Sequence, residues 1–238
     1  MTDHTPTQLP LNLARPQEPS FANFYAANNQ QTVLALKQRR APAQERVIYL
    51  WGPSGSGKSH LLQAACRDAS ENHQQCTYIN LSQRTELTPA ALEGLEQLQL
   101  VCLDNVDAAA GQPEWEAALF HLYNRILDRD GRLLIAGHSN VYEIPFTLAD
   151  LKSRLTWGLV FRLHPLSDSG KIIALQMRME EKGLVLSREV ALFLITRYQR
   201  DPQTLFNLAD RLDRASLAAQ RRLTIPFVKS TLSEHCKK

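Results

Sequence analysis

The sequence predicts an α/β fold, in which a parallel five-stranded sheet with flanking helices is followed by a small all-helical lid domain. Three observations support this prediction. Apolar runs typical of strands alternate with helical stretches over the first two thirds of the chain, a glycine-rich turn joins the first strand to a helix, and no strand pattern follows residue 165. We therefore expect three parts: an N-terminal arm (1–20), a core (21–164) and the lid (165–238).

The first twenty residues have the composition of an extended, flexible arm, because they are rich in Pro, Thr and Gln and show no helical or strand period. Within them, the run Q-L-P-L-N-L alternates leucines with other residues. In an extended chain, Leu9, Leu11 and Leu13 can enter the pockets of a partner while the amide of Gln8 forms a polar anchor. An arm that packs on its own domain is the alternative.

The folded part begins at F-A-N-F-Y (21–25), and a helical stretch follows at about 28–39. Phe21 and Phe24 lie just upstream of the glycine-rich turn. They are either core residues or the wall of a pocket for a nucleotide base.

The glycine-rich turn is G-P-S-G-S-G-K-S, between the apolar run 47–51 and a helix that contains Leu61 and Leu62. In this order, strand, turn and helix form a phosphate-binding loop. The glycines let backbone N–H groups surround a phosphate, the lysine reaches its outer oxygens, and the last serine hydroxyl can hold Mg²⁺. The predicted nucleotide-binding residues are Gly52, Pro53, Ser54, Gly55, Ser56, Gly57, Lys58 and Ser59.

The composition is that of a globular chain: 238 residues, of which 44% are hydrophobic and 21% charged, can form one large core and a small satellite domain. We expect neither secretion nor a membrane span, because the start is not basic-then-apolar and no uncharged apolar run of about 18 residues occurs. The four cysteines form no C-x-x-C pair. With a nucleotide site, this predicts reduced thiols in the cytoplasm.

Four more strands are expected after the turn, at 76–81, at 98–103 directly before Asp104, at 133–137 and at 159–163. Helical stretches lie between them, at 90–95, 114–127 and 148–155. This alternation predicts a parallel sheet that is covered on both faces. One strand intervenes between the phosphate-loop strand and the strand that ends in Asp104, which favours the ATPase branch of P-loop proteins over a nucleotide kinase.

Asp104 follows an apolar strand, so its carboxylate should lie beside the phosphate loop and hold the water shell of Mg²⁺. The next residue in a working ATPase is usually a second carboxylate that activates water, whereas Asn105 occupies this position here. An amide can orient a water molecule but cannot take its proton, so we expect weak or absent intrinsic hydrolysis. Asp107 is a poor geometric substitute.

Arg154 lies in L-K-S-R-L, just before the last predicted strand. A lone arginine on a helix is most often a surface ion-pair partner. Its place before the last strand of a P-loop ATPase sheet also makes it a candidate arginine finger, which would reach the γ-phosphate held by a neighbouring subunit.

The C-terminal third reads as four helices, at 167–181, 187–200, 202–220 and 226–232, with Ser167 as the first N-cap and Gly183 as the first stop. From Lys171 onward 13 Lys and Arg face 7 Asp and Glu, a net charge of +6, so the rest of the chain carries −3 of the total +3. This basic surface is either a solvated helical face or a contact for nucleic acid or an acidic partner.

These motifs resemble the AAA+ ATPase core of the bacterial replication initiator DnaA. The resemblance covers about residues 21–232 and is carried by the phosphate loop, the L-D-N strand end, the F-x-x-F entry segment and, most specifically, L-K-S-R-x-x-W-G. DnaA continues into a helix-turn-helix domain that reads DNA, and we expect no such module after the lid here. A DnaA-like core with the Q-L-P-L-N-L arm is similar to the regulatory inactivators within the DnaA family.

The resemblance implies an AAA+ fold and an action in trans. The arm would dock on the sliding clamp, the β subunit of DNA polymerase III, through Gln8, Leu9, Leu11 and Leu13, and DNA would be met mainly through the clamp. Arg154 would then stimulate hydrolysis of ATP bound to DnaA and limit re-initiation. A homo-oligomer is compatible with this reading and a membrane partner is not expected.

Two departures from the family pattern concern the nucleotide. The polar sensor after the fourth strand is an Asp-Arg pair in the family and H-S-N (138–140) here, which leaves Ser139 or Asn140 to reach a phosphate. Gln203 replaces the lid arginine, so ADP is favoured over ATP, with Mg²⁺ bound through Ser59 and Asp104.

The alternative function is an autonomous DNA-dependent AAA+ ATPase, such as a helicase loader or a site-specific initiator. It would use basic lid residues on DNA phosphates, namely Arg211, Arg214, Arg221 and Arg222.

Overall fold

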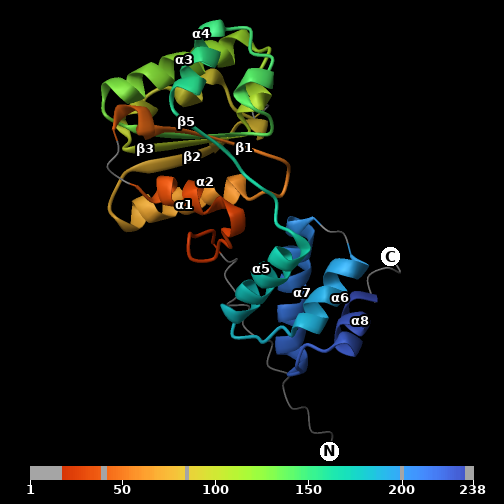
Figure 1. Ribbon diagram of the computed structural model, residues 1–238. Helices are drawn as coiled ribbons and strands as arrows, with labels where there is room; N and C mark the ends of the chain where they lie inside the picture. Colours follow the sequence, from red (N-terminus) through yellow and green to blue (C-terminus); the bar gives the residue numbers. More distant parts are fainter. Residues whose placement is uncertain (1–17, 39–41, 84–85, 199–200, 234–238) are drawn as a thin grey trace, which may run out of the picture. The chain divides into compact units, whose positions relative to one another are not determined.

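The computed structural model describes residues 18–38, 42–83, 86–198 and 201–233. These residues form two compact units, Pro19–Ala174 and a unit that begins at Leu175 (Figure 1). The candidate docking peptide, with Gln8, Leu9, Leu11 and Leu13, lies outside the described residues. Within the described ranges, no helix combines the length and the apolar character that a membrane span requires.

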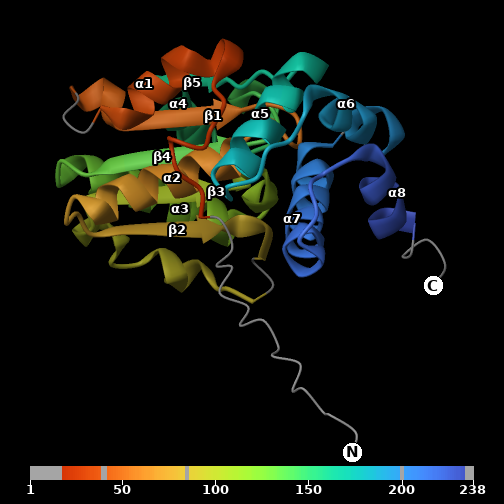
Figure 2. The same ribbon diagram turned by 90° about the horizontal axis from the view of Figure 1, so that it is seen from below.

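The first unit contains the expected parallel sheet of five strands. In Figure 2 the strands follow one another in the order β2-β3-β4-β1-β5. Their bounds are Val47–Trp51 for β1, Cys76–Asn80 for β2, Leu100–Asp104 for β3, Arg132–Gly137 for β4 and Leu159–Arg162 for β5. All four neighbouring pairs are parallel, which confirms the predicted fold class. The strand that separates β1 from β3 in space is β4, whereas β2 lies at an edge.

Helices cover both faces of this sheet (Figure 1). On one face α1 (Gln30–Lys37) and α2 (Lys58–Glu71) pack on Ile48 and Leu50, and on the other α3 (Pro113–Asp128) and α4 (Ala149–Trp157) pack on Val47 and Tyr49. Alternate residues of β1 therefore enter two different cores, as expected for a buried parallel strand.

The helical stretch expected at 90–95 differs from the structure. Two short 3₁₀ helices, Pro89–Leu92 and Leu95–Gln97, occupy the region instead. Gly94 between them has a φ of +78°, a left-handed conformation that interrupts any continuous helix. A single glycine therefore divides the apolar pattern into two turns.

The second unit is helical throughout its described residues, as predicted. It consists of the later part of α5 (Asp168–Glu180), together with α6 (Arg188–Arg197), α7 (Pro202–Ala219) and α8 (Ile225–Ser233). Ser167 caps α5, its Oγ accepting a hydrogen bond from the Gly170 N–H at 3.2 Å, and Gly183 follows α5 with a φ of +73°. A core that includes Leu175, Leu194 and Leu212 holds these helices together.

Candidate nucleotide-binding site

The phosphate loop connects β1 to α2 at the carboxyl edge of the sheet, where ligands of open α/β sheets bind. Gly57 has a φ of +96°, and a Cβ atom there would lie 2.6 Å from the Phe24 ring. A Cβ on Gly52 would lie 2.6 Å from the Leu163 carbonyl oxygen. Larger residues would collide at both positions, so the glycines are required by the local geometry as well as by the ligand chemistry.

Two buried polar groups of the loop, the Lys58 ammonium and the Ser56 hydroxyl, keep hydrogen-bonding capacity that the described residues do not use. Lys58 is only 6% exposed, and its Nζ donates to the carbonyls of Gly52 at 2.7 Å and Pro53 at 3.1 Å. Burial lowers the pKa of Lys58, against the opposing effect of the Asp104 and Asp107 carboxylates. The Oγ of Ser56 is buried and has no hydrogen-bond partner among the described residues. An anion with several acceptor oxygens fits both groups.

Asp104 ends β3 and is fully buried. Its Oδ2 accepts a hydrogen bond from the Tyr78 hydroxyl at 2.7 Å, and its Oδ1 accepts from the Asn105 N–H at 2.9 Å. Ser59 lies exposed in the first turn of α2. The carboxylate and the hydroxyl thus flank the loop from two elements, the arrangement that holds Mg²⁺ beside a nucleotide in P-loop proteins.

The two side chains considered for water activation are both held by protein groups. Asn105 has a φ of +56°, and its Nδ2 donates to Asn80 Oδ1 at 2.8 Å. Asp107 Oδ2 accepts from the His138 N–H at 2.7 Å, and its Oδ1 accepts from the Ser139 N–H at 3.4 Å. Asp107 therefore anchors the segment that follows β4.

That segment, H-S-N (138–140), carries the candidate sensor residues. Tyr49 donates its hydroxyl proton to the Ser139 carbonyl at 2.8 Å, and burial raises the pKa of this tyrosine. The Asn140 Oδ1 accepts from the Tyr142 N–H at 3.2 Å and so caps the 3₁₀ helix Val141–Glu143. Of the two candidates, Asn140 thus already uses its carbonyl oxygen within the chain.

Arg154 is exposed on α4, whose Leu151 and Leu155 are buried. No described residue forms an ion pair with it. Buried Leu151 and Leu155 hold the helix, and no carboxylate among the described residues neutralises the guanidinium.

The start of α4 is held by a buried carboxylate. Glu116 of α3 is fully buried and accepts hydrogen bonds from the Leu148 N–H at 2.7 Å, the Thr147 hydroxyl at 2.9 Å and the Gly111 N–H at 2.7 Å. Burial opposes the charged form of Glu116, but these donors outweigh it, so its pKa lies below the ordinary value. The carboxylate satisfies the N–H of Leu148, the N-cap of the helix that carries Arg154.

Family models identify both parts of the chain. The model of the bacterial DnaA ATPase domain matches residues 17–162, more than half of the sequence. The chain belongs to the bacterial DnaA ATPase domain family. A second model, the lid domain of Hda, matches residues 168–232. The two matches confirm the predicted relationship to Hda, the DnaA-homologous regulatory inactivator.

Solved structures share the AAA+ fold of the DnaA-type chain. Domain III of DnaA from Thermotoga maritima is 20% identical with a TM-score of 0.74, over 94% of this chain and 100% of that one. AMPPCP-bound DnaA from Aquifex aeolicus is 19% identical with a TM-score of 0.67, over 83% of this chain and 65% of that one. The RuvB Holliday junction branch migration motor of T. maritima is 16% identical with a TM-score of 0.63, over 87% and 68%.

The two phenylalanines of the entry segment, Phe21 and Phe24, have different surroundings. Phe24 packs against Gly57 and stacks near His60, with ring centroids 5.5 Å apart, whereas Phe21 lies under the Lys37 ammonium at 5.4 Å. Only Phe24 is thereby placed against the phosphate loop. Gln203 is exposed in the second unit, where its Nε2 donates to Asn207 Oδ1 at 3.3 Å.

Sequence reasoning missed several residues that build the DnaA-type site. Buried Asn29 donates to the His164 carbonyl at 3.0 Å and accepts from the His164 N–H at 2.8 Å, which fixes the chain next to Leu163 and the loop. Tyr49, Tyr78 and Glu116 were likewise not expected. For Glu116 a signal existed, since it precedes the buried Leu119 by three residues on α3, a spacing that places a carboxylate on the apolar face.

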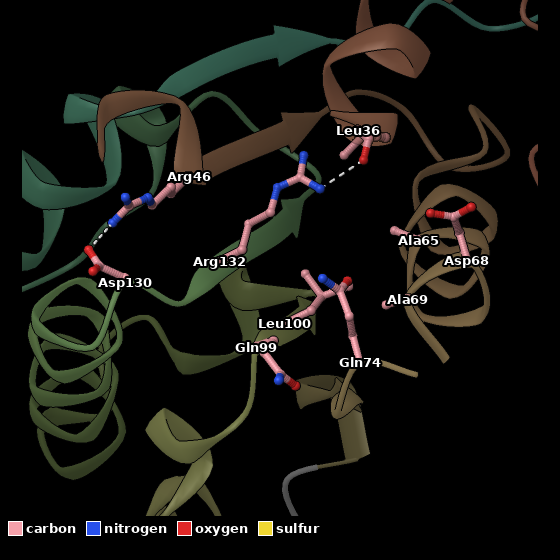
Figure 3. Close-up of a pocket in the computed structure, with 10 residues that line it drawn as sticks. All are labelled: Leu36, Arg46, Ala65, Asp68, Ala69, Gln74, Gln99, Leu100, Asp130 and Arg132. Atoms are coloured by element: carbon pink, nitrogen blue, oxygen red, sulfur yellow. Dashed lines mark hydrogen bonds and ion pairs between the residues drawn. The ribbon is translucent and has the colours of Figure 1, made fainter. Parts of the chain in front are cut away.

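A pocket of about 530 Å³ lies at the opposite, amino edge of the sheet (Figure 3). Its charged residues are engaged within the protein. Arg46 forms an ion pair with Asp130, and Arg132 donates from Nη1 to the Leu36 carbonyl at 2.8 Å and from Nη2 to the Ala35 carbonyl at 2.7 Å. The Nε of Arg132 is the one buried polar atom of this side chain without a partner among the described residues.

Proposed function

We propose that this chain is a nucleotide-binding regulator of DnaA. It docks on the DNA-loaded sliding clamp, the β subunit of DNA polymerase III, and stimulates hydrolysis of DnaA-bound ATP in trans, which limits re-initiation of replication. Membership of the DnaA ATPase domain family and the match to the Hda lid support this proposal. The docking peptide is Gln8 to Leu13.

The nucleotide is an adenine nucleotide, with ADP preferred to ATP. Lys58 and the Ser56 hydroxyl, which has no partner among the described residues, supply the donors, and the DnaA of A. aeolicus, a structural relative, was solved with AMPPCP. Ser59 and Asp104 hold Mg²⁺, which when bound neutralises phosphate charge. Gln203 cannot supply the charge that favours a third phosphate.

The observation that carries the proposal is the exposed charge of Arg154. It lies on α4, a helix that buried Leu151 and Leu155 hold against the core. A guanidinium presents five donors in a rigid fork that suits phosphate oxygens, and an arginine finger acts by placing this fork at the γ-phosphate of another active site. Asn105 also supports a chain that stimulates hydrolysis by DnaA and hydrolyses little ATP itself. Its amide cannot take a proton and is bonded to Asn80, so hydrolysis by the chain itself is weak.

The decisive experiment measures hydrolysis of DnaA-bound ATP in the presence of clamp-loaded DNA, with and without this protein. We expect Arg154→Ala to abolish the stimulation while leaving nucleotide binding intact. Arg125→Ala is the matched control, because Arg125 is an arginine of the neighbouring helix that is already paired with Glu96 at 3.2 Å. Full stimulation by Arg154→Ala would rule out the arginine finger.

Clamp docking is tested separately by pull-down. Replacing Gln8 and Leu9 with alanine should abolish capture by the clamp, since the polar anchor and one apolar contact are lost together. Nucleotide affinity should stay unchanged. Capture at the level of the unchanged protein would contradict the docking peptide.

The exposed arginines of the second unit favour a second candidate, an autonomous DNA-dependent ATPase. Arg214, Arg221 and Arg222 are exposed there, and Arg211 lies on the same helix as Arg214. This function requires salt-sensitive DNA binding by the protein alone and turnover that DNA increases. If the protein alone neither binds DNA nor turns over faster with DNA, and it stimulates ATP hydrolysis by DnaA, the regulator is the correct function.

A further inference from the structure

Tyr78 occupies a position between the phosphate-loop helix and the end of β3. It lies in β2 opposite Cys102, so Asp104 is two residues further along the neighbouring strand and on the same face of the sheet. The Tyr78 hydroxyl donates to Asp104 Oδ2 at 2.7 Å. Ser59 and Gln63, both on α2, act to lower the pKa of this hydroxyl, against the larger effect of burial, which raises it. The Tyr78 hydroxyl therefore binds the candidate metal carboxylate directly.

This hydrogen bond matters because Asp104 can hold a metal-bound water only if its carboxylate keeps one orientation. An outer-shell carboxylate holds metal-bound water in place when its own position is fixed by further hydrogen bonds. Here the Asn105 N–H fixes Oδ1 and the Tyr78 hydroxyl fixes Oδ2. The first donor is a backbone group that a substitution of Tyr78 leaves in place, so Tyr78 is the side chain that decides how rigidly the carboxylate is held.

We propose that Tyr78 is a positioning residue that holds Asp104 for Mg²⁺ and thereby sets how strongly Mg²⁺ tightens nucleotide binding. This inference rests on the proposed nucleotide site and adds to it a residue that acts through Asp104. In this role Tyr78 acts on the metal through the Asp104 carboxylate. Its removal leaves the phosphate loop complete and loosens only the carboxylate.

The test compares ADP affinity in Mg²⁺ with ADP affinity in EDTA, by calorimetry on the full chain. For Tyr78→Phe we expect the ratio of the two affinities to fall about tenfold, the lower range for loss of an outer-shell partner. The affinity in EDTA should stay within about twofold, because the loop itself is unchanged. Tyr123→Phe is the matched control, since the Tyr123 hydroxyl is also buried but has no partner among the described residues.

A double-mutant cycle with Asp104→Asn separates positioning from packing. If Tyr78 acts through the carboxylate, Tyr78→Phe should not change the ratio further once Asp104 is neutral. An unchanged ratio in Tyr78→Phe, an equal loss of affinity in Mg²⁺ and EDTA, or an additive effect in the Asp104→Asn background would each overturn this role. Absence of ADP binding by the unchanged protein would instead overturn the nucleotide site itself, and the role of Tyr78 with it.

Discussion

The two edges of the sheet both carry positively charged side chains, but in different surroundings. At the carboxyl edge the ammonium of Lys58 donates to two loop carbonyls, and the Ser56 hydroxyl has no partner among the described residues. At the amino edge the opening is large, about 530 Å³, yet Arg46 is paired with Asp130 and Arg132 caps the last carbonyls of α1. Unpartnered polar atoms do not separate the two edges, since Arg132 Nε also lacks a partner among the described residues, and the size of the opening does not indicate a ligand site either. What distinguishes the carboxyl edge is the glycine-rich loop between β1 and α2, whose backbone N–H groups suit a phosphate.

Among the variants that test this difference between the two edges, Lys58→Ala should have the largest effect. Truncating one partner of a buried charged contact costs about 2–5 kcal/mol, so we expect ADP affinity to fall by about three orders of magnitude. The free energy of unfolding of the unliganded protein should not decrease, because burial already disfavours the Lys58 ammonium, as its lowered pKa indicates. Calorimetry measures the first and urea unfolding the second.

Lys171→Ala serves as the control for Lys58, since its ammonium pairs with Asp168 at 3.3 Å on a different element. Undiminished ADP affinity in Lys58→Ala would remove the carboxyl edge as the nucleotide site.

Arg132→Ala should have the reverse effect at the amino edge. It removes two hydrogen bonds to carbonyls of α1 together with the packing of a long side chain, so we expect the free energy of unfolding to fall by about 2–4 kcal/mol. ADP affinity should change by less than about twofold, because no polar group of the phosphate loop loses a partner. A comparable loss of ADP affinity would show that the two edges are not functionally distinct.

Asn105→Asp tests whether the amide at this position limits ATP hydrolysis at the carboxyl edge. A carboxylate can take the proton of an attacking water where the amide cannot, so we expect intrinsic ATP hydrolysis to rise about tenfold, below the usual range for a well-placed base. The gain is limited because residue 105 is turned toward Asn80. Single-turnover hydrolysis measures it, and a rate equal to that of the unchanged protein would show that something other than Asn105 limits hydrolysis.

Glu116→Gln should have the smallest effect, and it depends on pH. The pKa of Glu116 is lowered in the folded protein, so its contribution is complete above its ordinary pKa and is lost as the pH falls through the lowered value. We expect the glutamine variant to be about 1 kcal/mol less stable near neutral pH and equally stable in strong acid. Urea unfolding at several pH values tests this, and a constant difference would mean that the carboxylate charge is not involved.

Much of the nucleotide edge followed from local sequence patterns. The apolar run Val47–Trp51, the glycine turn and the helix beginning at Lys58 are adjacent in the chain, so strand period, turn chemistry and helix start together specify the phosphate loop. Asp104 was found for the same reason, because it directly follows an apolar strand. The region 90–95 was misjudged because Gly94 adopts a left-handed conformation that the apolar spacing does not reveal.

The sequence by itself determined the strands, the phosphate loop, the helical second unit and the identity of Asn105 and Arg154. Only the tertiary structure decided which groups are already engaged. Asn29 meets His164 across 135 residues, Glu116 meets Leu148 across 32 and Tyr78 meets Asp104 across 26. Such contacts depend on the packing of distant elements, which no local pattern encodes. The positions of the reactive side chains can thus be predicted from neighbours in the chain, whereas their freedom to act is set by neighbours in space.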